Sequence, residues 1–460
     1  MSSYLASIDA RALAEEFPLG DDFVRRFTTI SRDELRALQE GRFRRCVERA
    51  WRTPFYQRLW GEAGAEPGDI RSLDDLARLP TFDKSDIMAS IARRPPLGDF
   101  HGMETYAPDE RPPVILHTTS GTTGKPQVLL FGPRGREVQN LLLARAYLFQ
   151  GLRDDDVVHS VYGHGMINGG HYVRETFTHW TRALFLSAGT GVETRSVTQV
   201  ELMRDFGATV IVGFADYVKH LAGVARGAGI EPGRDLKVRM ICGHVGEDRE
   251  AVRAAWPGAD VFDWYGVGDT GIIAGEGPDH AGLYVMEDAQ YLELLDLESG
   301  SPVTGGESGD MVVTVLFKDD IYPMIRFNTH DVTAFRTDAS PLGLSLRRIR
   351  GFLGRSDNMV KLRGINVFPQ AIGTMLAAAP GYAGDYICRL DRDAGGRDVL
   401  AVLVEVREAD AALVPAYREL LKRRIGVEVE VELKAPRELA ALTGIDSRQK
   451  PIRLIDGRKK

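Results

Sequence analysis

Between residues 157 and 266, short apolar runs alternate with amphipathic segments, and this alternation limits the fold more than any other feature of the sequence. The runs are rich in Val and Ile, which is typical of buried strands, and the segments between them place apolar residues at helical spacing. Strands are expected at 157–161, 208–212, 238–243 and 260–266, and helices at 199–206 and 217–228. This order predicts a wound α/β domain that binds its ligands at the carboxyl ends of the strands.

The regions on either side have different patterns. Residues 31–52 predict an amphipathic helix, and residues 80–86 predict a turn into another helix. After Glu276 the sequence predicts short strands separated by Gly, Asp and Pro turns, which indicates a β-rich subdomain. These strands are expected at 291–296, 309–316 and 324–327.

The C-terminal part predicts a smaller α+β domain. Its helices are expected at 370–378 and 413–424, and its strands at 386–389, 399–406 and 427–433. A segment dense in Arg, Gly and Asp, residues 348–363, marks the expected boundary. The expected fold class is therefore α/β, with an N-terminal domain of wound sheets and a β-rich subdomain over 1–354, and a C-terminal domain over 355–460.

Composition narrows the functional class. A chain of 460 residues exceeds what one hydrophobic core usually serves, and its net charge of −7 argues against nucleic-acid or anionic-membrane partners. Cys46, Cys242 and Cys388 are far apart, which argues against a disulfide framework or a closed zinc site and fits a reducing compartment. The sequence begins without a signal-peptide pattern and has no apolar run of roughly 20 residues. We therefore expect a cytoplasmic protein.

A loop rich in hydroxyl groups, glycine and lysine follows the apolar run 114–116. It consists of Thr119, Ser120, Gly121, Thr122, Thr123, Gly124 and Lys125. Glycine lets backbone N–H groups approach an anion, the hydroxyls donate, and lysine adds a positive charge, so the loop suits a polyphosphate. Its spacing differs from a Walker A loop, which has four residues between its first glycine and the Gly-Lys pair. From composition alone, a polar surface turn explains the loop equally well.

Four more segments have residues suited to nucleotide chemistry. They are 263–270 with Asp263, Trp264, Tyr265, Gly266 and Asp269; 326–331 with Asp331; 354–369 with Arg355, Asp357 and Gly364; and 447–450 with Lys450. In this order and together with the loop, they resemble the acyl-adenylate-forming (ANL) superfamily of CoA ligases, luciferases and adenylation domains. The resemblance is greatest to the phenylacetate–CoA ligase branch, and it covers the chain from about Arg32 to the end.

The resemblance implies a role for each motif residue. Residues 119–125 would hold the β- and γ-phosphates of ATP, and Asp263, Trp264, Tyr265 and Gly266 would form the adenine site, with Asp263 at the amino group and Tyr265 on the ring. Asp331 would accept the ribose hydroxyls beside Arg355, and Asp269 would help to bind Mg²⁺. Lys450 would reach the carboxylate and α-phosphate during adenylation. Asp357 would be the hinge about which the C-terminal domain rotates, bringing the Gly364 loop to the site for the CoA step.

The acid site is predicted from the same resemblance. Residues 161–170 resemble the segment that lines the acyl site in this branch, which gives Tyr162, His164 and Gly165 as candidates, and Phe214, Gly243 and His244 as further walls. His164 either contacts a polar aromatic acid or is a structural histidine. Tyr217 shares a helical face with Leu221 and is expected in the core. The run Lys422–Arg424 is a solvated helix end or a contact to the 3′-phosphate of CoA.

The predicted function is an AMP-forming ligase that activates a small aromatic acid with ATP and Mg²⁺ and transfers it to coenzyme A. Asp269 replaces the glutamate of the family, Gln449 replaces the glycine before the lysine, and His330 precedes Asp331 where relatives have Gly or Arg. These departures keep alternatives open: another acceptor (an amine or a carrier-protein thiol), nitrite coupled to an aryl amine, or a silent nucleotide-binding scaffold. The oligomeric state is also open, a homodimer included.

Overall fold

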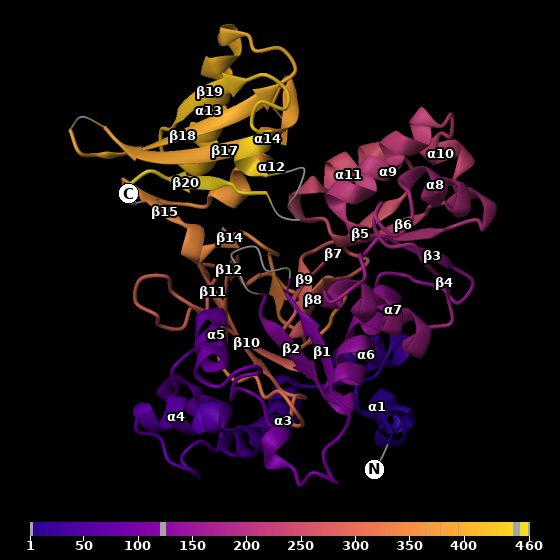
Figure 1. Ribbon diagram of the computed structural model, residues 1–460, viewed down its shortest axis with the longest axis vertical. Coiled ribbons are helices and arrows are strands. Elements are labelled where there is room, and N and C mark those ends of the chain that lie inside the picture. The colour runs from indigo at the N-terminus through magenta and orange to yellow at the C-terminus, as the bar shows by residue number, and fades with distance from the viewer. Residues whose placement is uncertain are drawn as a thin grey trace. The chain divides into compact units, whose positions relative to one another are not determined.

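The computed structural model describes residues 3–119, 126–363, 365–377, 379–393, 395–444 and 451–458. The chain forms two compact units, the first made of 1–329 and 333–351 and the second of 330–332 and 352–460 (Figure 1). The chain thus passes from one unit to the other between Gly351 and Phe352, close to the boundary at 354/355 that the sequence suggested. Among the described residues, no helix is long and apolar enough to cross a membrane.

The first unit is organised around an eight-stranded sheet in the order β13-β9-β8-β7-β6-β5-β3-β4. Strands β3 to β7 are parallel to one another, and β8, β9 and β13 continue the sheet beyond β7 as antiparallel strands. The strands are β3 (Val157–Ser160), β4 (Leu184–Ser187), β5 (Val210–Phe214), β6 (Met240–His244), β7 (Asp260–Val267), β8 (Gly271–Glu276), β9 (Leu283–Val285) and β13 (Arg348–Ile349). The connecting helices are α7 (Asn168–Trp180), α8 (Ser196–Asp205), α9 (Ala215–Gly227), α10 (Pro232–Asp235) and α11 (Arg249–Ala255).

Both faces of this sheet are covered, as the continuous apolar runs predicted. In β5, Val210 and Val212 belong to one hydrophobic cluster and Ile211 belongs to another, because successive side chains of a strand point to opposite faces. The wound α/β arrangement expected for residues 157–266 is therefore confirmed.

The N-terminal helices and two smaller sheets complete the first unit. The helices are α1 (Ala10–Glu16), α2 (Gly20–Thr29), α3 (Arg32–Trp51), α4 (Pro54–Glu62), α5 (Lys84–Arg93) and α6 (Pro133–Phe149). The helix predicted at 31–52 is confirmed as α3, which begins with a capping box between Ser31 and Glu34. The hairpin β1 (Ile115–Thr118) and β2 (Val128–Phe131) flanks the phosphate loop, residues 119–125.

The β-rich subdomain contains β10 (Gln290–Leu295), β11 (Ser308–Val315) and β12 (Phe327–Ala334), which are neighbours in this order, with β10 antiparallel to β11. The strand predicted at 324–327 is wrong in its position, because β12 begins only at Phe327. Arg326 has a φ of 58°, outside the extended region, and its guanidinium pairs with Glu293 at 3.0 Å. An alternating apolar pattern does not reveal such a local bend.

The second unit is a sheet in the order β19-β18-β17-β20 with helices packed against it (Figure 1). Its elements are β14 (Gly354–Arg355), β15 (Val360–Leu362), β16 (Ile365–Val367), α12 (Ile372–Ala377), β17 (Tyr382–Arg392), β18 (Asp398–Val406), α13 (Val414–Ile425), β19 (Glu430–Lys434), α14 (Ala440–Thr443) and β20 (Leu454–Asp456). Tyr417 and Leu421 on α13 pack into a cluster with β17 and β18 residues such as Leu390 and Val402. The unit therefore has its own hydrophobic core.

Candidate active site

A row of aromatic rings lies where the parallel strands end. The Tyr162 ring contacts the Phe214 ring edge-on, with centroids 5.0 Å apart, and Phe214 stacks on His244 at 5.2 Å. The His244 ring in turn lies 4.2 Å from the Trp264 ring. Tyr162 and Trp264 are buried, and Phe214 is 44% exposed. The structure thus brings three predicted acid-site residues together with Trp264 of the predicted nucleotide segment.

Two predicted glycines have a packing reason for being glycine. A Cβ at Gly243 would lie 1.8 Å from the backbone oxygen of Gly213 on the neighbouring strand, and a Cβ at Gly266 would lie 2.4 Å from the oxygen of Gly271. Both positions therefore need backbone alone, which keeps the strand ends beside the ring row in close contact.

His164 and Gly165 lie in a different setting. The Nε2 atom of His164 is 2.9 Å from the Ser187 hydroxyl, and its ring meets His171 edge-on at 5.5 Å. His171 stacks on His117 at 4.7 Å and contacts the backbone oxygen of Gly165 through its Nε2 atom at 2.7 Å. His164 is therefore hydrogen-bonded within the protein, and its contact with an acid stays a prediction.

Asp263 lies on β7 next to the ring row. Its Oδ1 atom accepts a hydrogen bond from the backbone N–H of Val245 at 3.2 Å, and its own N–H donates to Glu276 at 2.9 Å. Burial, and then the negative charge of Glu276, raise the pKa of Asp263 to about 7. Arg249 neutralises Glu276 through two hydrogen bonds of 2.8 and 2.7 Å. Tyr265, two residues further on, is buried in the main hydrophobic cluster.

Asp269 is buried in the turn that follows β7. Its Oδ1 atom accepts hydrogen bonds from Gln127 Nε2 at 2.6 Å and from the Tyr322 hydroxyl at 2.8 Å. The Lys318 ammonium donates to the backbone oxygen of Asp269. Burial raises the pKa of the Asp269 carboxyl, against the two hydrogen bonds and the Lys318 charge.

The donor set at Asp269 is compatible with magnesium. No described residue donates a hydrogen bond to its second oxygen, Oδ2, and the described residues contain no group of three or more His, Cys, Asp or Glu side chains that would hold a metal by themselves. Mg²⁺ typically takes one or two carboxylates and completes its shell with phosphate oxygens and water. A single carboxylate fits that role.

In the second unit, Arg355 joins two predicted site carboxylates. It donates to Asp331 Oδ1 at 2.8 Å and forms two bonds, of 2.9 and 2.6 Å, with Asp357. Asp331 and Arg355 are also paired residues of β12 and β14. The predicted ribose acid and the predicted hinge residue are therefore linked through one guanidinium.

The remaining predicted residues lie outside the described part of the chain. They are Ser120, Gly121, Thr122, Thr123, Gly124, Lys125, Gly364 and Lys450. The residues flanking two of these segments are described and are joined directly. Thr119 N donates to Gln127 O at 3.0 Å, and Ile452 N donates to Thr443 O at 2.8 Å. We call Thr119 and Gln127 the neck of the phosphate loop, and Thr443 and Ile452 the neck of the Lys450 segment.

Similarity to known proteins decides the family. Residues 364–458 match the AMP-binding enzyme C-terminal domain. The phenylacetate-coenzyme A ligase of Aromatoleum evansii is 31% identical over 438 residues, which are 90% of this chain and 93% of that one. The enzyme of the same name from Thermus thermophilus is 31% identical over 428 residues, 90% of each chain. The chain belongs to the phenylacetate–coenzyme A ligase family.

A solved relative agrees with the fold. 2-Hydroxyisobutyryl-CoA ligase in the postadenylation state, in complex with 2-HIB-AMP, matches with a TM-score of 0.79 and 26% identity, over 95% of this chain and 92% of that one. The membership in the acyl-adenylate-forming superfamily that the motifs predicted is therefore confirmed, and so is the α/β fold with a separate C-terminal domain.

Four residues that hold other side chains or chain segments in place have no motif that marks them in the sequence. They are Gln127, Lys318, Tyr322 and Asp385, and all of them are buried. Gln127 lies just beyond the phosphate loop, which was the single available signal. The other three residues contact partners that are far away in the sequence, so only the folded structure reveals these contacts.

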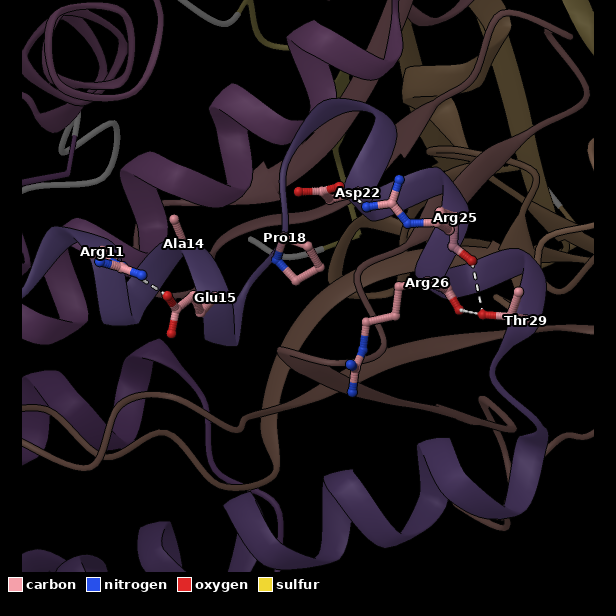
Figure 2. Close-up of a pocket in the computed structure, with 8 residues that line it drawn as sticks. All are labelled: Arg11, Ala14, Glu15, Pro18, Asp22, Arg25, Arg26 and Thr29. Atoms are coloured by element: carbon pink, nitrogen blue, oxygen red, sulfur yellow. Dashed lines mark hydrogen bonds and ion pairs between the residues drawn. The ribbon is translucent and has the colours of Figure 1, made fainter.

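A groove on the surface of the N-terminal helices is separate from the site. Figure 2 shows it on α1 and α2, with a volume of about 660 Å³. It is lined by Arg11, Ala14, Glu15, Pro18, Asp22, Arg25, Arg26 and Thr29. Arg11 and Arg25 are paired there with Glu15 and Asp22, so their charges are compensated. None of the predicted site residues lies on these helices.

Proposed function

We propose that this ligase family member activates a small aromatic carboxylic acid with ATP, releases pyrophosphate, and transfers the acyl group from acyl-AMP to coenzyme A. The observation that supports this most directly is the row of Tyr162, Phe214, His244 and Trp264 rings beside Asp263. Flat apolar rings favour an aromatic partner through stacked and edge-on contacts. The neighbouring Asp263 supplies the acceptor that an adenine amino group needs.

The chemistry requires positioning and charge neutralisation. A carboxylate oxygen of the acid attacks the α-phosphorus of ATP, and the bond to the pyrophosphate oxygen breaks. The acid is already ionised at neutral pH, so no general base is needed. Lys125 and Lys450 neutralise the charge that builds on the phosphate oxygens. Mg²⁺ bound at Asp269 would add to this neutralisation.

In the second step, the thiol of coenzyme A loses its proton to solvent, its sulfur attacks the acyl carbon, and AMP leaves with the electron pair of the broken C–O bond. We assign Gly364 to the path of coenzyme A. We assign Asp357 to the hinge about which the C-terminal domain rotates between the two steps. Localisation in the cytoplasm and the oligomeric state stay predictions.

The first experiment is acid-dependent exchange of pyrophosphate into ATP over a panel of aryl and aliphatic acids, with nitrite included. Exchange that requires an aryl acid is expected, and the Lys450→Ala variant should lose most of it, on the order of 10²-fold or more. Lys434→Ala is the matched control, because Lys434 lies at the end of the outer strand β19 and pairs there with Glu432 and with Glu438 beyond the strand. Full exchange in the Lys450→Ala variant would contradict the role of that lysine.

The acceptor needs a separate measurement. Mass spectrometry of the products should show acyl-AMP when coenzyme A is left out, and an acyl-CoA and AMP when coenzyme A is added. An acyl-AMP that persists after coenzyme A is added would exclude this acceptor and favour an amine or a carrier-protein thiol. Exchange supported by nitrite but by no carboxylic acid would point to the oxyanion alternative, for which the Asp269 and Gln449 departures leave room.

A further inference from the structure

The phosphate loop is connected to Asp269 by a buried contact that no motif describes. At the neck of the loop, Thr119 N donates to Gln127 O at 3.0 Å and Gln127 N donates to Thr119 Oγ1 at 3.2 Å. The side chain of Gln127 turns inward from the neck, is buried, and donates to Asp269 Oδ1 at 2.6 Å. One residue therefore fixes the base of the loop through its backbone and the carboxylate through its side chain.

Tyr322 contacts the same carboxylate oxygen from another part of the chain. Its hydroxyl donates to Asp269 Oδ1 at 2.8 Å, and its ring packs on Phe100 with centroids 5.0 Å apart. The Lys318 ammonium lies 4.6 Å from the centre of the Tyr322 ring and donates to the Asp269 backbone oxygen. Both the turn and the side chain of Asp269 are thereby held.

An ionised Asp269 carboxylate costs free energy at this buried position unless a bound cation compensates its charge. Asp269 and Lys318 are both buried, and the ammonium donates to the backbone of Asp269 rather than to its carboxylate. A buried carboxylate without a direct ion pair is expensive to keep ionised. The two neutral donors share one oxygen, which leaves Oδ2 as the oxygen available to a cation.

We propose that Gln127 and Tyr322 are positioning residues that hold Asp269 in one orientation and join it to the phosphate loop, so that the metal and the triphosphate are bound as one unit. The proposal rests on the proposed function only in taking Mg²⁺·ATP as the ligand. It also accounts for the aspartate that replaces the glutamate of the family. Tyr322 and Gln127 compensate for the missing methylene by fixing the shorter side chain from two sides.

The test compares nucleotide binding with and without the metal, in the absence of any acid. Titration calorimetry would measure the Kd of ATP in EDTA and in excess Mg²⁺ for the parent, Tyr322→Phe and Gln127→Met. A hydrogen bond to a charged group is worth about tenfold or more. The Mg²⁺ advantage is the Kd of ATP in EDTA divided by its Kd in Mg²⁺. Each variant should lower this ratio about tenfold, with a smaller change in the Kd measured in EDTA. In exchange assays, the KM for Mg²⁺·ATP should rise more than kcat falls.

Controls separate positioning from folding. Tyr417→Phe removes a hydroxyl bonded to the Pro380 oxygen at 2.9 Å in the second unit, and it should leave the Mg²⁺ advantage unchanged. Because Gln127 and Tyr322 act on one oxygen, the double variant should lose less than the product of the two single losses. An unchanged ratio of the two Kd values in both single variants would overturn the proposal. Because no acid is present in this experiment, that result would not contradict the acid-activating function, which the exchange assay tests separately.

Discussion

Each of the two units has a neck that joins the ends of a segment containing a predicted site lysine, and each neck is linked to a buried carboxylate. The charges of these two carboxylates, Asp269 and Asp385, are compensated in different ways. At the phosphate loop, Gln127 connects the neck to Asp269, and the described residues that donate to this carboxylate, Gln127 and Tyr322, are both neutral. At the Lys450 segment, Thr443 donates to Asp385 Oδ2 at 2.8 Å, and Arg453 donates to the other oxygen of the same carboxylate. Among the described residues, no cation forms a direct ion pair with the first carboxylate, whereas the second is paired with Arg453.

This difference distinguishes a carboxylate kept for a ligand from one kept for structure. Burial raises the pKa of Asp269, so its ionised form opposes folding, and such perturbed groups are concentrated at functional sites. Asp385 joins Thr443 and Arg453, one on each side of residues 445–450, and the Arg453 guanidinium also lies 4.4 Å from the Tyr386 ring. Removing the first charge should damage function, and removing the second should damage stability.

The largest effect is expected from Asp385→Ala. Deleting one partner of a buried ion pair leaves the other charge uncompensated and typically costs about 3–5 kcal/mol. All five tryptophans precede residue 265, so hydrogen exchange of β17 and β18, rather than tryptophan fluorescence, should report the loss. Asp391→Ala is the matched control on β17, because its pair with Arg389 is half exposed and should contribute less than about 1 kcal/mol. Equal protection in both variants would contradict the structural role of Asp385.

Asp269→Asn should show the opposite pattern. The amide keeps an acceptor for Gln127 and Tyr322 but removes the charge that a cation needs, so exchange should fall about 10²-fold. Stability should equal or exceed that of the parent. Because the folded-state pKa of Asp269 is raised, the parent loses stability as pH rises above the pKa of an unfolded carboxyl, about 4, and the variant should lack this part of the loss. A strongly destabilised variant would remove the distinction between the two carboxylates.

The sequence predicts the residues at the strand ends better than the side-chain partners of the two buried carboxylates. Phe214 and His244 were predicted from the family resemblance, and they meet because the carboxyl ends of parallel strands lie at one edge of a sheet. Tyr322 contacts Gln127 across 195 positions, and no periodicity connects them. Asp385 and Arg453 are separated by 68 positions and meet only because β20 pairs beside β17. Side-chain partners that depend on tertiary packing could not be predicted, whereas the wound α/β order of residues 157–266 could.

A milder change at the neck of the Lys450 segment tests whether the Thr443 hydroxyl contributes to stability. Thr443→Val has nearly the same shape but leaves Asp385 Oδ2 without its donor, which should cost about 1–2 kcal/mol of stability in the second unit. Thr443→Ser restores the hydroxyl and should recover most of the loss. Hydrogen exchange of β17 and β20 measures both variants. Equal losses in the serine and valine variants would assign the effect to packing of the methyl group.

Asp263 extends the comparison to a third carboxylate, one whose charge changes near neutral pH. With a pKa of about 7, its carboxyl is mostly protonated at pH 6 and mostly ionised at pH 8. If it accepts from the adenine amino group, the affinity for ATP should rise by up to about tenfold over this range, and Asp263→Asn should flatten the profile. Inosine triphosphate is the matched ligand, because it has the same triphosphate but an oxygen in place of the amino group. Its affinity should fall over the same range, since the protonated carboxyl is the form that can donate to that oxygen. Parallel profiles for the two nucleotides would place the pH dependence in the triphosphate and remove Asp263 from base recognition.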